Sequence, residues 1–521
     1  MNHETAYITT PIYYVNDKPH IGHAYSTTLC DVWARAMRAD GKDVFFLTGT
    51  DEHGVKVEKS AQERGMAPQA LADENAEEFK KVMDVFGLSN DDFIRTTEER
   101  HESRVKAFVT TLLEKGDVYL GEFEGWYDEG QEEYLTETQA RDHEYKSPIS
   151  GKPLTKATEK NYYFKLSAYQ DRLETYFTEH PGFVKPDARR NEVLGRLRDG
   201  LQDVPITRTN FTWGIPFPGD EEHVIYVWID ALMNYATALG MDDPENSERA
   251  KYWPAQYHVI GKEILWFHAV IWPAVLMALE LEQPKCIYAH SFWISEGQKM
   301  SKSLGNFIDL PTIEGYMSTY GRDAWRWYMI NHGPLDATDA DFQAEKFHEV
   351  YNTDLVNTVG NCASRTTAMI DKYFEGHVPE DDGRVFEGWD MKATCEKSVA
   401  EWKAAMDDFD LDGACEAGMT IVRTVDAFIN GTEPFRIAKD ESRKEELAAI
   451  LYRCAECVRI ASLLLAPVLT ERMADLWTAM GIEHNPDDGG LSEAVAWGGL
   501  KPGTNVTKVA LFPRVEFSAA E

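Results

Sequence analysis

Two histidines flank a glycine in the run Pro19-His20-Ile21-Gly22-His23, which follows a short apolar segment and opens a long amphipathic pattern. The pattern predicts that this run forms the N-terminus of a helix. Backbone N–H groups and the helix dipole favour a phosphate at such a terminus, and imidazole N–H groups can donate to phosphate oxygens. We therefore expect His20, Gly22 and His23 to bind the phosphates of a nucleotide.

A second basic motif, Lys299-Met300-Ser301-Lys302-Ser303, lies far downstream, between two glycines. Alone it would carry little weight, because short Lys/Ser runs are common in loops. Together with the histidine motif it predicts a clamp that closes on a triphosphate from two sides. Flexible ammonium groups suit a loop that grips pyrophosphate during a reaction and then releases it. Lys299 and Lys302 are therefore candidate catalytic residues, alongside the two histidines.

Residues 49–54, Gly-Thr-Asp-Glu-His-Gly, end a short apolar run. A turn rich in capping residues would explain this composition. The functional alternative is that Asp51 stands at the mouth of a parallel sheet, where ligands bind. Its carboxylate could there hold a substrate ammonium group.

A third set of candidates consists of aromatic and apolar residues that follow predicted strands. Each one alone is better explained as core, but as a set they could line a site for a flexible apolar side chain. The set is Ile12, Tyr14, Trp228, Ala231, Leu232, Tyr235, Ile264, His268 and Trp272.

The elements that must position these residues follow an α/β pattern. Residues 7–10 predict a strand, a helix follows from about residue 22, and residues 44–47 predict a second strand, which together make a βαβ unit of a parallel sheet. Between residues 116 and 222 the composition becomes acidic and rich in turn residues, which indicates an inserted domain. Strands are again predicted at 224–227, 258–260 and 286–289, and residues 264–279 predict a buried apolar helix.

The last third of the chain has a different pattern. Helical periodicity dominates over 350–374, 389–409, 415–429 and 445–465, which predicts a helix bundle. Cys454 and Cys457 lie within it, and without a second cysteine pair they are interpreted as buried small residues rather than as zinc ligands.

Composition limits the classes of protein to be considered. A chain of 521 residues predicts two to four domains. The net charge of −35 argues at first against a nucleic-acid partner, yet 53 basic residues can still cluster locally. A general contribution to solubility is the favoured explanation of the charge.

The cysteines and the N-terminus indicate a cytoplasmic protein. Seven cysteines are too few and odd in number for a disulfide framework, which fits a reducing compartment. No signal peptide is recognised. The apolar stretch 264–279 is too short for a membrane span, so no membrane association is expected.

Taken together, the motifs closely resemble those of the methionyl-tRNA synthetases, a family of class I aminoacyl-tRNA synthetases. Besides the three motifs above, the resemblance rests on Thr10–Asn16, Tyr226–Ala231 and Ile260–Glu263 and extends along essentially the whole chain. It implies a Rossmann-type catalytic domain (1–115 and 223–309), a connective-peptide insertion (116–222), a stem-contact segment (310–349) and an all-α anticodon-binding bundle (350–521). Members of the family form methionyl-adenylate from L-methionine and ATP, with Mg²⁺, and then transfer methionine to the terminal adenosine of tRNA(Met), initiator and elongator.

The resemblance also implies roles for single residues. Asp51 would hold the methionine ammonium group, and Tyr235 and His268 would lie nearest the thioether. Gly261 and Glu263 fall where the family holds the adenosine and ribose, and His20, His23 and Lys302 where it holds the phosphates. Three residues would contact the anticodon: Asn361, Arg365 and Phe435, the last standing where the family has a stacking Trp.

The chain departs from the family pattern in its insertion. Many members carry a zinc knuckle there, but the four ligand places are occupied by Asp128, Gln131, Ser147 and Ser150. Three of these are neutral and none is a thiolate, so no structural zinc is expected. The chain also ends after the bundle, where longer members carry a dimerising domain, and a monomer is therefore expected.

Three alternatives remain at this stage. A class I synthetase for another apolar amino acid would need a much larger insertion, or a zinc-bound thiolate in the case of cysteine. A small-molecule adenylyltransferase would leave the predicted bundle without a role. A tRNA-binding scaffold protein would not need His20, His23, Asp51 and Lys302, all of which are present.

Overall fold

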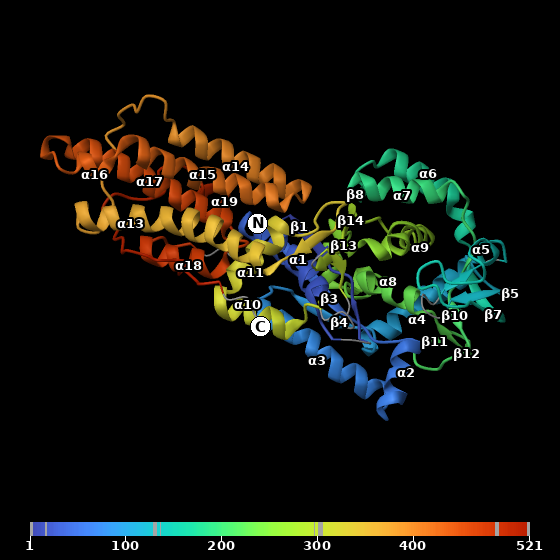
Figure 1. Cartoon of the computed structure of the whole chain (residues 1–521). Coiled ribbons are helices and arrows are strands. Elements are labelled where there is room, and N and C mark those ends of the chain that lie inside the picture. The colour runs from blue at the N-terminus through green and yellow to red at the C-terminus, as the bar shows by residue number, and fades with distance from the viewer. Residues whose placement is uncertain are drawn as a thin grey trace.

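A central parallel sheet separates a helical bundle at one end of the molecule from a smaller lobe at the other (Figure 1). The computed structural model describes residues 4–15, 18–128, 133–135, 137–295, 297–300, 306–484 and 489–517. The predicted combination of a parallel α/β sheet with a C-terminal helical region is confirmed.

The central sheet has the strand order β2-β3-β1-β13-β14-β8, with β4 also paired to β3. All of these pairings are parallel. Helix α1 (Ile21–Ala39) connects β1 to β3 and completes the predicted βαβ unit. The strands are β1 (Thr5–Thr9), β2 (Tyr13–Tyr14), β3 (Asp43–Asp51), β4 (Asp92–Arg95), β8 (Val184–Lys185), β13 (Tyr257–Gly261) and β14 (Cys286–His290).

Both faces of the sheet are buried, which explains the continuous apolar runs of its strands. Successive strand residues point to opposite faces. In β1, Ala6 and Ile8 join the core shared with α1 and the bundle, whereas Tyr7 joins the core on the other face. That second core is built with α4 (Glu99–Lys115) and α8 (Val227–Thr237).

The lobe is formed within residues 116–222, around an antiparallel sheet with the order β6-β5-β7-β9. One short strand of the same range, β8, pairs with β14 instead, so backbone hydrogen bonds join the lobe to the central sheet. The lobe contains β5 (Val118–Asp128), β6 (Glu133–Leu135), β7 (Thr155–Phe164), β9 (Val204–Pro205), α5 (Glu137–Asp142), α6 (Gln170–Glu179) and α7 (Asp187–Leu197).

The prediction that 224–227 forms a strand of the central sheet is wrong. The strand there is β12 (Asp220–Ile225), which pairs with β10 (Thr207–Arg208) and β11 (Pro216–Phe217) in a separate antiparallel sheet. Tyr226 is already the N-cap of α8. The reason is local: a turn at Gly219, with φ of +81°, folds β12 back on β11 before it could reach the central sheet.

The buried helix predicted over 264–279 is confirmed, although it is not a regular α-helix along its whole length. The segment consists of a short turn η4 (Lys262–Ile264), a π-helical turn η5 (Phe267–Ile271) and α9 (Trp272–Leu279). Pro273 has no N–H to donate to the preceding turn, which disfavours a regular α-helix through this point. The π-turn contains His268, and such turns are frequent at functional sites.

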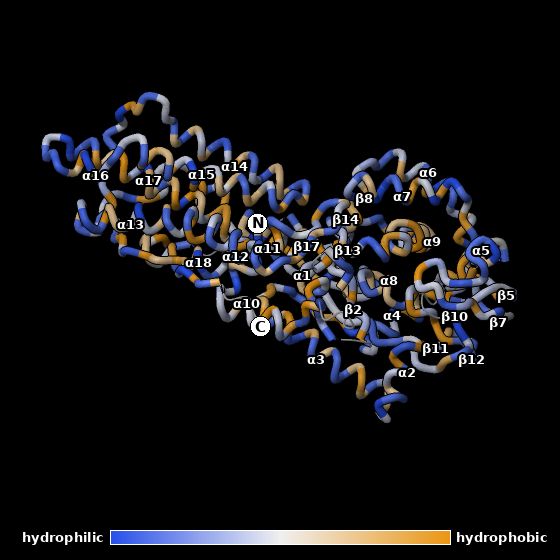
Figure 2. The backbone as a smooth tube through the Cα atoms, in the orientation of Figure 1, coloured by the Kyte–Doolittle hydropathy of each residue, from blue (hydrophilic) through white to orange (hydrophobic). Residues whose placement is uncertain are grey.

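The C-terminal region packs its apolar residues between helices, and Figure 2 shows hydrophobic stretches along α15 and α17. Arg326 joins this region to the sheet domain: its guanidinium donates to Asp31 of α1 at 2.7 Å and to the carbonyls of Pro467 and Val468. The helices are α10 (Leu310–Tyr320), α11 (Arg322–His332), α12 (Ala344–Val350), η7 (Tyr351–Gly360), α13 (Asn361–Phe374), α14 (Met391–Asp408), α15 (Leu411–Thr432), α16 (Pro434–Ile437), α17 (Lys444–Leu465), α18 (Thr470–Met480) and α19 (Leu491–Ala494).

Candidate active site

A cavity of about 380 Å³ opens at the carboxyl ends of the central strands, where a parallel sheet binds its ligands. Most of the residues predicted from the sequence line it. They are Ile12, Tyr14, His20, Gly22, His23, Asp51, Trp228, Ala231, Leu232, Tyr235, Gly261, Glu263, Ile264 and His268. Trp272 does not line the cavity; it lies buried behind it, in the core.

His20 and His23 form the N-terminal cap of α1 with their own rings. The backbone N–H of Gly22 donates to Nδ1 of His20 at 3.1 Å, and the backbone N–H of His20 donates to Nδ1 of His23 at 3.2 Å. The two rings lie 3.9 Å apart between centroids. A Cβ at position 22 would lie 3.0 Å from the His20 ring, so glycine leaves the room that this arrangement needs.

This cap determines which ring nitrogen of His23 carries a proton. Burial, and then the neighbouring His20, hold the pKa of His23 well below its usual value, so the ring is neutral. Its Nδ1 accepts a hydrogen bond, and the single proton is therefore on Nε2. The helix terminus thus presents a neutral imidazole N–H donor beside the positive end of a helix dipole.

The chain that follows the second motif lies close to the first. Ile21 donates its N–H to the carbonyl of Ile308 at 3.1 Å, and His20 forms a β-bridge with Asp309. Lys299 lies in the short strand β16 (Gln298–Lys299), paired with β15 (Trp293–Ser295). Lys302 is outside the described residues.

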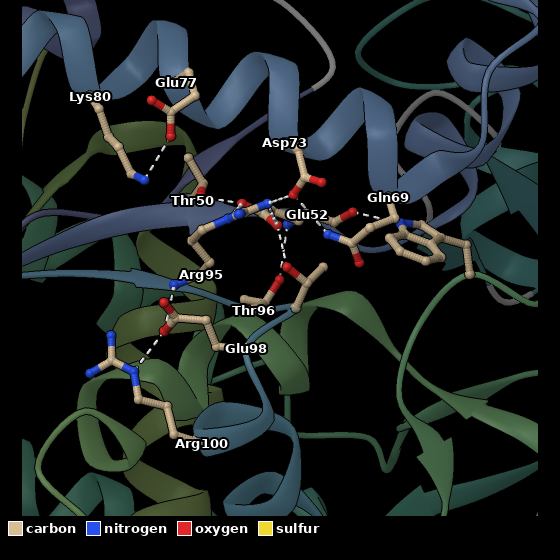
Figure 3. Close-up of polar contacts among 12 residues, drawn as sticks. Thr50, Glu52, Gln69, Asp73, Glu77, Lys80, Arg95, Thr96, Glu98 and Arg100 are labelled. Carbon is tan, nitrogen blue, oxygen red and sulfur yellow. Dashed lines mark hydrogen bonds and ion pairs between the residues drawn. The ribbon is translucent and has the colours of Figure 1, made fainter.

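Asp51 ends β3 and is 8% exposed. Its neighbour Glu52 is held away from the cavity by a dense set of polar contacts (Figure 3). Arg95 donates to both carboxylate oxygens of Glu52, at 2.7 and 2.9 Å, and the Thr50 hydroxyl donates at 2.6 Å. Such bidentate contacts fix geometry, so the strand end that carries Asp51 is rigidly held.

A buried carboxylate also links this strand end to α8. Asp230 Oδ2 lies 2.7 Å from Nδ1 of His53, and Oδ1 lies 2.7 Å from Nε2 of His101 on α4. Burial alone would lower the pKa of His53, but Asp230 raises it above the usual value. Burial would raise the pKa of Asp230, and the two histidines lower it instead.

The far end of the cavity holds a fixed hydroxyl–imidazole pair. Nδ1 of His268 lies 2.9 Å from the carbonyl of Ile264, and Tyr235 Oη lies 2.8 Å from Nε2. Burial lowers the pKa of His268 to about 4, so the ring is neutral. With the ring proton on Nδ1, which donates to the carbonyl, Nε2 of His268 accepts a hydrogen bond from the Tyr235 hydroxyl.

The remaining walls of this end are apolar. Trp228 stacks on Phe267 at 3.9 Å with an interplanar angle of 11°. Ile12, Ala231 and Ile264 complete the lining. A thioether or short alkyl chain would be desolvated here, beside a single polar pair.

On the opposite side, Gly261 and Glu263 line the cavity at the end of β13. Burial raises the pKa of the Glu263 carboxyl group. A hydrogen bond from its own backbone and the charges of Lys262 and Lys299 act in the opposite direction. A Cβ at position 261 would lie 2.5 Å from the Glu263 carboxylate, so a side chain there would displace that carboxylate.

The sequence interpretation missed further lining residues: Pro11, Tyr13, Ser26, Lys56, Val227, His290 and Phe292. His290 ends β14 directly beside Gly261, and its Nε2 lies 2.7 Å from the Ser26 hydroxyl. Its position at a strand end, preceding the lysine motif, was a usable signal. Ser26 stands one turn after Gly22 on α1, which is visible from helical spacing alone.

Two of the four positions that were expected to lack zinc ligands, Ser147 and Ser150, lie in one turn. Ser147 Oγ accepts the N–H groups of Ile149 and Ser150, at 3.3 and 3.0 Å, and Asp128 is buried. Gln131 lies outside the described residues. Where the structure describes the chain, no group of three or more His, Cys, Asp or Glu residues is arranged to hold a metal ion.

The three candidate anticodon residues lie in the bundle. Asn361 and Arg365 are one helical turn apart on α13. Arg365 is held by an ion pair with Asp426 at 3.1 Å and a hydrogen bond to Asn430 at 2.9 Å, both on α15. Phe435 on α16 is 44% exposed.

Within the described residues, every helix is too short or too polar to span a lipid bilayer.

Comparisons with known proteins agree with this geometry. The family described as "tRNA synthetases class I (M)" matches residues 6–143 and 142–367. The chain is 42% identical to the methionine–tRNA ligase of Halalkalibacterium halodurans, over 98% of this chain and 79% of that protein. It is 41% identical to the methionine–tRNA ligase of Bacillus subtilis, over 98% of this chain and 78% of that protein.

Solved structures of a methionyl-tRNA synthetase are also similar to this chain. Mycobacterium tuberculosis methionyl-tRNA synthetase in complex with methionyl-adenylate is similar with a TM-score of 0.91 and 35% identity, covering 98% of this chain and 100% of that chain. The free-state structure of the same enzyme has a TM-score of 0.86 and 32% identity, covering 99% and 100%.

Proposed function

The chain belongs to the methionyl-tRNA synthetases, a family of class I aminoacyl-tRNA synthetases, and from that premise we propose how its residues divide the work of the reaction. The protein is a methionine–tRNA ligase. It activates L-methionine with ATP to methionyl-adenylate and pyrophosphate, and it transfers the methionyl group to the 3′-terminal adenosine of tRNA. ATP enters as its Mg²⁺ complex, which is a substrate and not a resident cofactor.

The observation that carries the proposal is a single cavity with three chemically distinct parts. One part is the pair of capping histidines, the second is Asp51 at the strand end, and the third is the apolar end with Tyr235 and His268. A triphosphate, an ammonium group and a thioether would each meet a matching environment there. Positioning and electrostatics are what adenylate formation requires, since no covalent enzyme intermediate is needed.

In the first step a carboxylate oxygen of methionine attacks the α-phosphorus of ATP, and the bond to pyrophosphate breaks. His20 and His23 donate N–H groups to the phosphate oxygens that gain charge. Lys299 and Lys302 neutralise the leaving pyrophosphate. Gly261 and Glu263 hold the adenosine and its ribose.

Methionine is held at both of its ends. Asp51 pairs with the ammonium group. The side chain lies among Ile12, Tyr14, Trp228, Ala231, Leu232 and Ile264, with its thioether beside Tyr235 and His268. In the second step a ribose hydroxyl of the terminal adenosine attacks the methionyl carbonyl, and AMP leaves.

The bundle would select the tRNA. Asn361 and Arg365 would contact the anticodon and Phe435 would stack on one of its bases, with both initiator and elongator tRNA(Met) as substrates. We further propose the division into a catalytic domain (1–115 and 223–309), an insertion (116–222), a stem-contact segment (310–349) and a bundle (350–521). We also propose a cytoplasmic location and a monomer. One chain supplies all the cavity residues named above, so no second copy is needed to complete the site.

ATP–pyrophosphate exchange with each amino acid in turn tests the first step without tRNA. Exchange should depend on methionine, and exchange with leucine but not with methionine would contradict the proposal. Charging of initiator and elongator tRNA(Met) then tests the second step.

A further inference from the structure

A second cavity, of about 260 Å³, lies directly beside the first, and Trp228 lines both. Its walls come from two parts of the chain. Arg196 of α7, Arg208 of β10 and Asp203 belong to the insertion, whereas Trp266 and Phe267 belong to the catalytic part. Any molecule seated here would touch both parts and would lie one aromatic ring away from the methionine site.

The walls of this cavity combine flat rings with guanidinium groups. The guanidinium of Arg196 lies 3.9 Å from the centre of the Trp266 ring, and that of Arg208 lies 3.9 Å from the centre of the Tyr226 ring. Arg208 is only 1% exposed and donates to the carbonyl of Thr207 at 3.0 Å. Aromatic faces with interleaved arginines are the surfaces on which single-stranded nucleic acids stack their bases.

The polar groups at the mouth of the second cavity include hydrogen-bond donors and acceptors. Arg196 is an exposed donor, and Asp199, Gln202 and Asp203 supply acceptors, Asp203 already accepting from the Tyr119 hydroxyl at 2.8 Å. Cytosine presents an amino donor next to ring nitrogen and carbonyl acceptors, and carboxylates commonly accept from that amino group. A purely anionic ligand would instead meet two carboxylates.

We propose that this second cavity seats the penultimate cytidine of the tRNA 3′ end, an inference that rests on the proposed function. The terminal adenosine must bring its ribose to the adenylate in the first cavity, so the preceding nucleotide lies immediately outside it. Every mature tRNA ends in cytidine-cytidine-adenosine, so a base-sized site next to the methionine pocket would serve every tRNA(Met).

The test uses the full-length protein and a tRNA(Met) that carries a fluorescent cytidine analogue at the penultimate position, whose emission is quenched by stacking. ATP–pyrophosphate exchange is measured first; it needs no tRNA, so its failure would count against the proposed function alone. The wild-type protein should quench the analogue. Trp266→Ala and Arg196→Gln should each raise KM for tRNA roughly tenfold and reduce the quenching, while leaving exchange unchanged.

Arg172→Gln is the matched control, because Arg172 is also an exposed arginine stacked on a ring of the insertion, 5.3 Å from the centre of Tyr169, outside the cavity. It should behave like the wild type in every assay. An unquenched analogue in the wild-type complex would overturn the proposal whatever the variants do. A normal KM for tRNA in Arg196→Gln would do the same, since this exposed side chain can be replaced without loss of the fold.

Discussion

The imidazole of His53 and the carboxylate of Asp230 lie 2.7 Å apart beneath the active-site cavity, where both side chains are almost completely buried. His53 follows Asp51 by two residues at the end of β3, and Asp230 lies on α8 between Trp228 and Ala231. The contact therefore connects β3, which carries Asp51, the proposed partner of the substrate ammonium group, to α8, which carries part of the proposed side-chain pocket. We regard Asp230 as a positioning residue for methionine.

Replacing Asp230 by Asn keeps the shape of the side chain and removes its charge. Because a buried ion-pair partner is lost, we expect the free energy of unfolding to fall by about 3 kcal/mol. KM for methionine should rise roughly tenfold in ATP–pyrophosphate exchange, with KM for ATP nearly unchanged, because only the methionine subsites lose their alignment. Asp408→Asn, which removes an exposed ion pair with Lys185, is the control and should cost less than about 1 kcal/mol. An equal rise of both KM values would argue for a general loss of structure.

The same contact predicts a pH dependence of stability. The pKa of His53 is raised by Asp230, with Glu102 and Glu52 acting in the same direction, so its contribution is fully present below about pH 6.5 and is lost as the pH rises through the folded-state pKa. The pKa of Asp230 is lowered, so its contribution is lost as the pH falls below about 3.8. Urea unfolding of the wild type and Asp230→Asn should differ most between about pH 4 and 6.5. A difference that stays constant up to pH 9 would contradict the assignment.

The tautomer of His23 predicts which substitutes keep activity. His23 lines the cavity, and its Nδ1 accepts the hydrogen bond of the helix cap, which leaves Nε2 as the N–H donor of the ring. The amide of Gln can reach the position of Nε2, whereas that of Asn reaches only that of Nδ1. We expect His23→Ala and His23→Asn to lower kcat of adenylate formation by roughly 10²- to 10³-fold and His23→Gln to retain clearly more. Pre-steady-state adenylate formation measures this step directly, and greater retention by Asn than by Gln would reverse the assignment.

Whether a site residue can be predicted from the sequence depends on its place in the secondary structure. Residues in short motifs at strand ends or helix starts, such as His20, Asp51 and Gly261, could be placed because βαβ units bring strand ends together at one edge. The Asp230 contact could not be predicted, since its partners come from β3 and α4 and no local pattern connects them to α8. His290 and Ser26 are different, because local signals mark both: His290 ends a strand and Ser26 stands one helical turn after Gly22.

The one wrong strand and the irregularity of one predicted helix both have local physical causes. Residues 224–227 have the composition of a buried strand, but the turn at Gly219 pairs the segment with its own neighbour. Residues 264–279 have the composition of one helix, but Pro273 withholds an N–H and a π-turn precedes it. Composition predicts burial well, and it predicts hydrogen-bond partners poorly.

The exposed ring of Phe435 predicts an effect on tRNA that leaves amino-acid activation untouched. Base–aromatic stacking contributes about 1–3 kcal/mol, so Phe435→Ala should raise KM for tRNA(Met) roughly tenfold, while ATP–pyrophosphate exchange stays at the wild-type rate. Phe435→Trp should lower KM, because a larger ring stacks better. Val385, which is 90% exposed in the bundle, provides the control Val385→Ala. An unchanged KM in Phe435→Ala would exclude a role of this ring in binding.

The buried pair of Arg326 and Asp31 connects the bundle to the helix that begins with the histidine motif. Both side chains are fully buried, and Arg326 also donates to the carbonyls of Pro467 and Val468. Asp31→Asn leaves the buried charge of Arg326 without a carboxylate, so it should lower the free energy of unfolding by about 3–5 kcal/mol. Arg326→Met should cost less, because Asp31 keeps its ion pair with Arg35 at 2.8 Å. The double variant should be less destabilised than the sum of the two, since it leaves neither charge alone, and urea unfolding of all four proteins gives the coupling energy. Additive single effects would show that each residue acts through its backbone contacts and that the ion pair itself does not join the two domains.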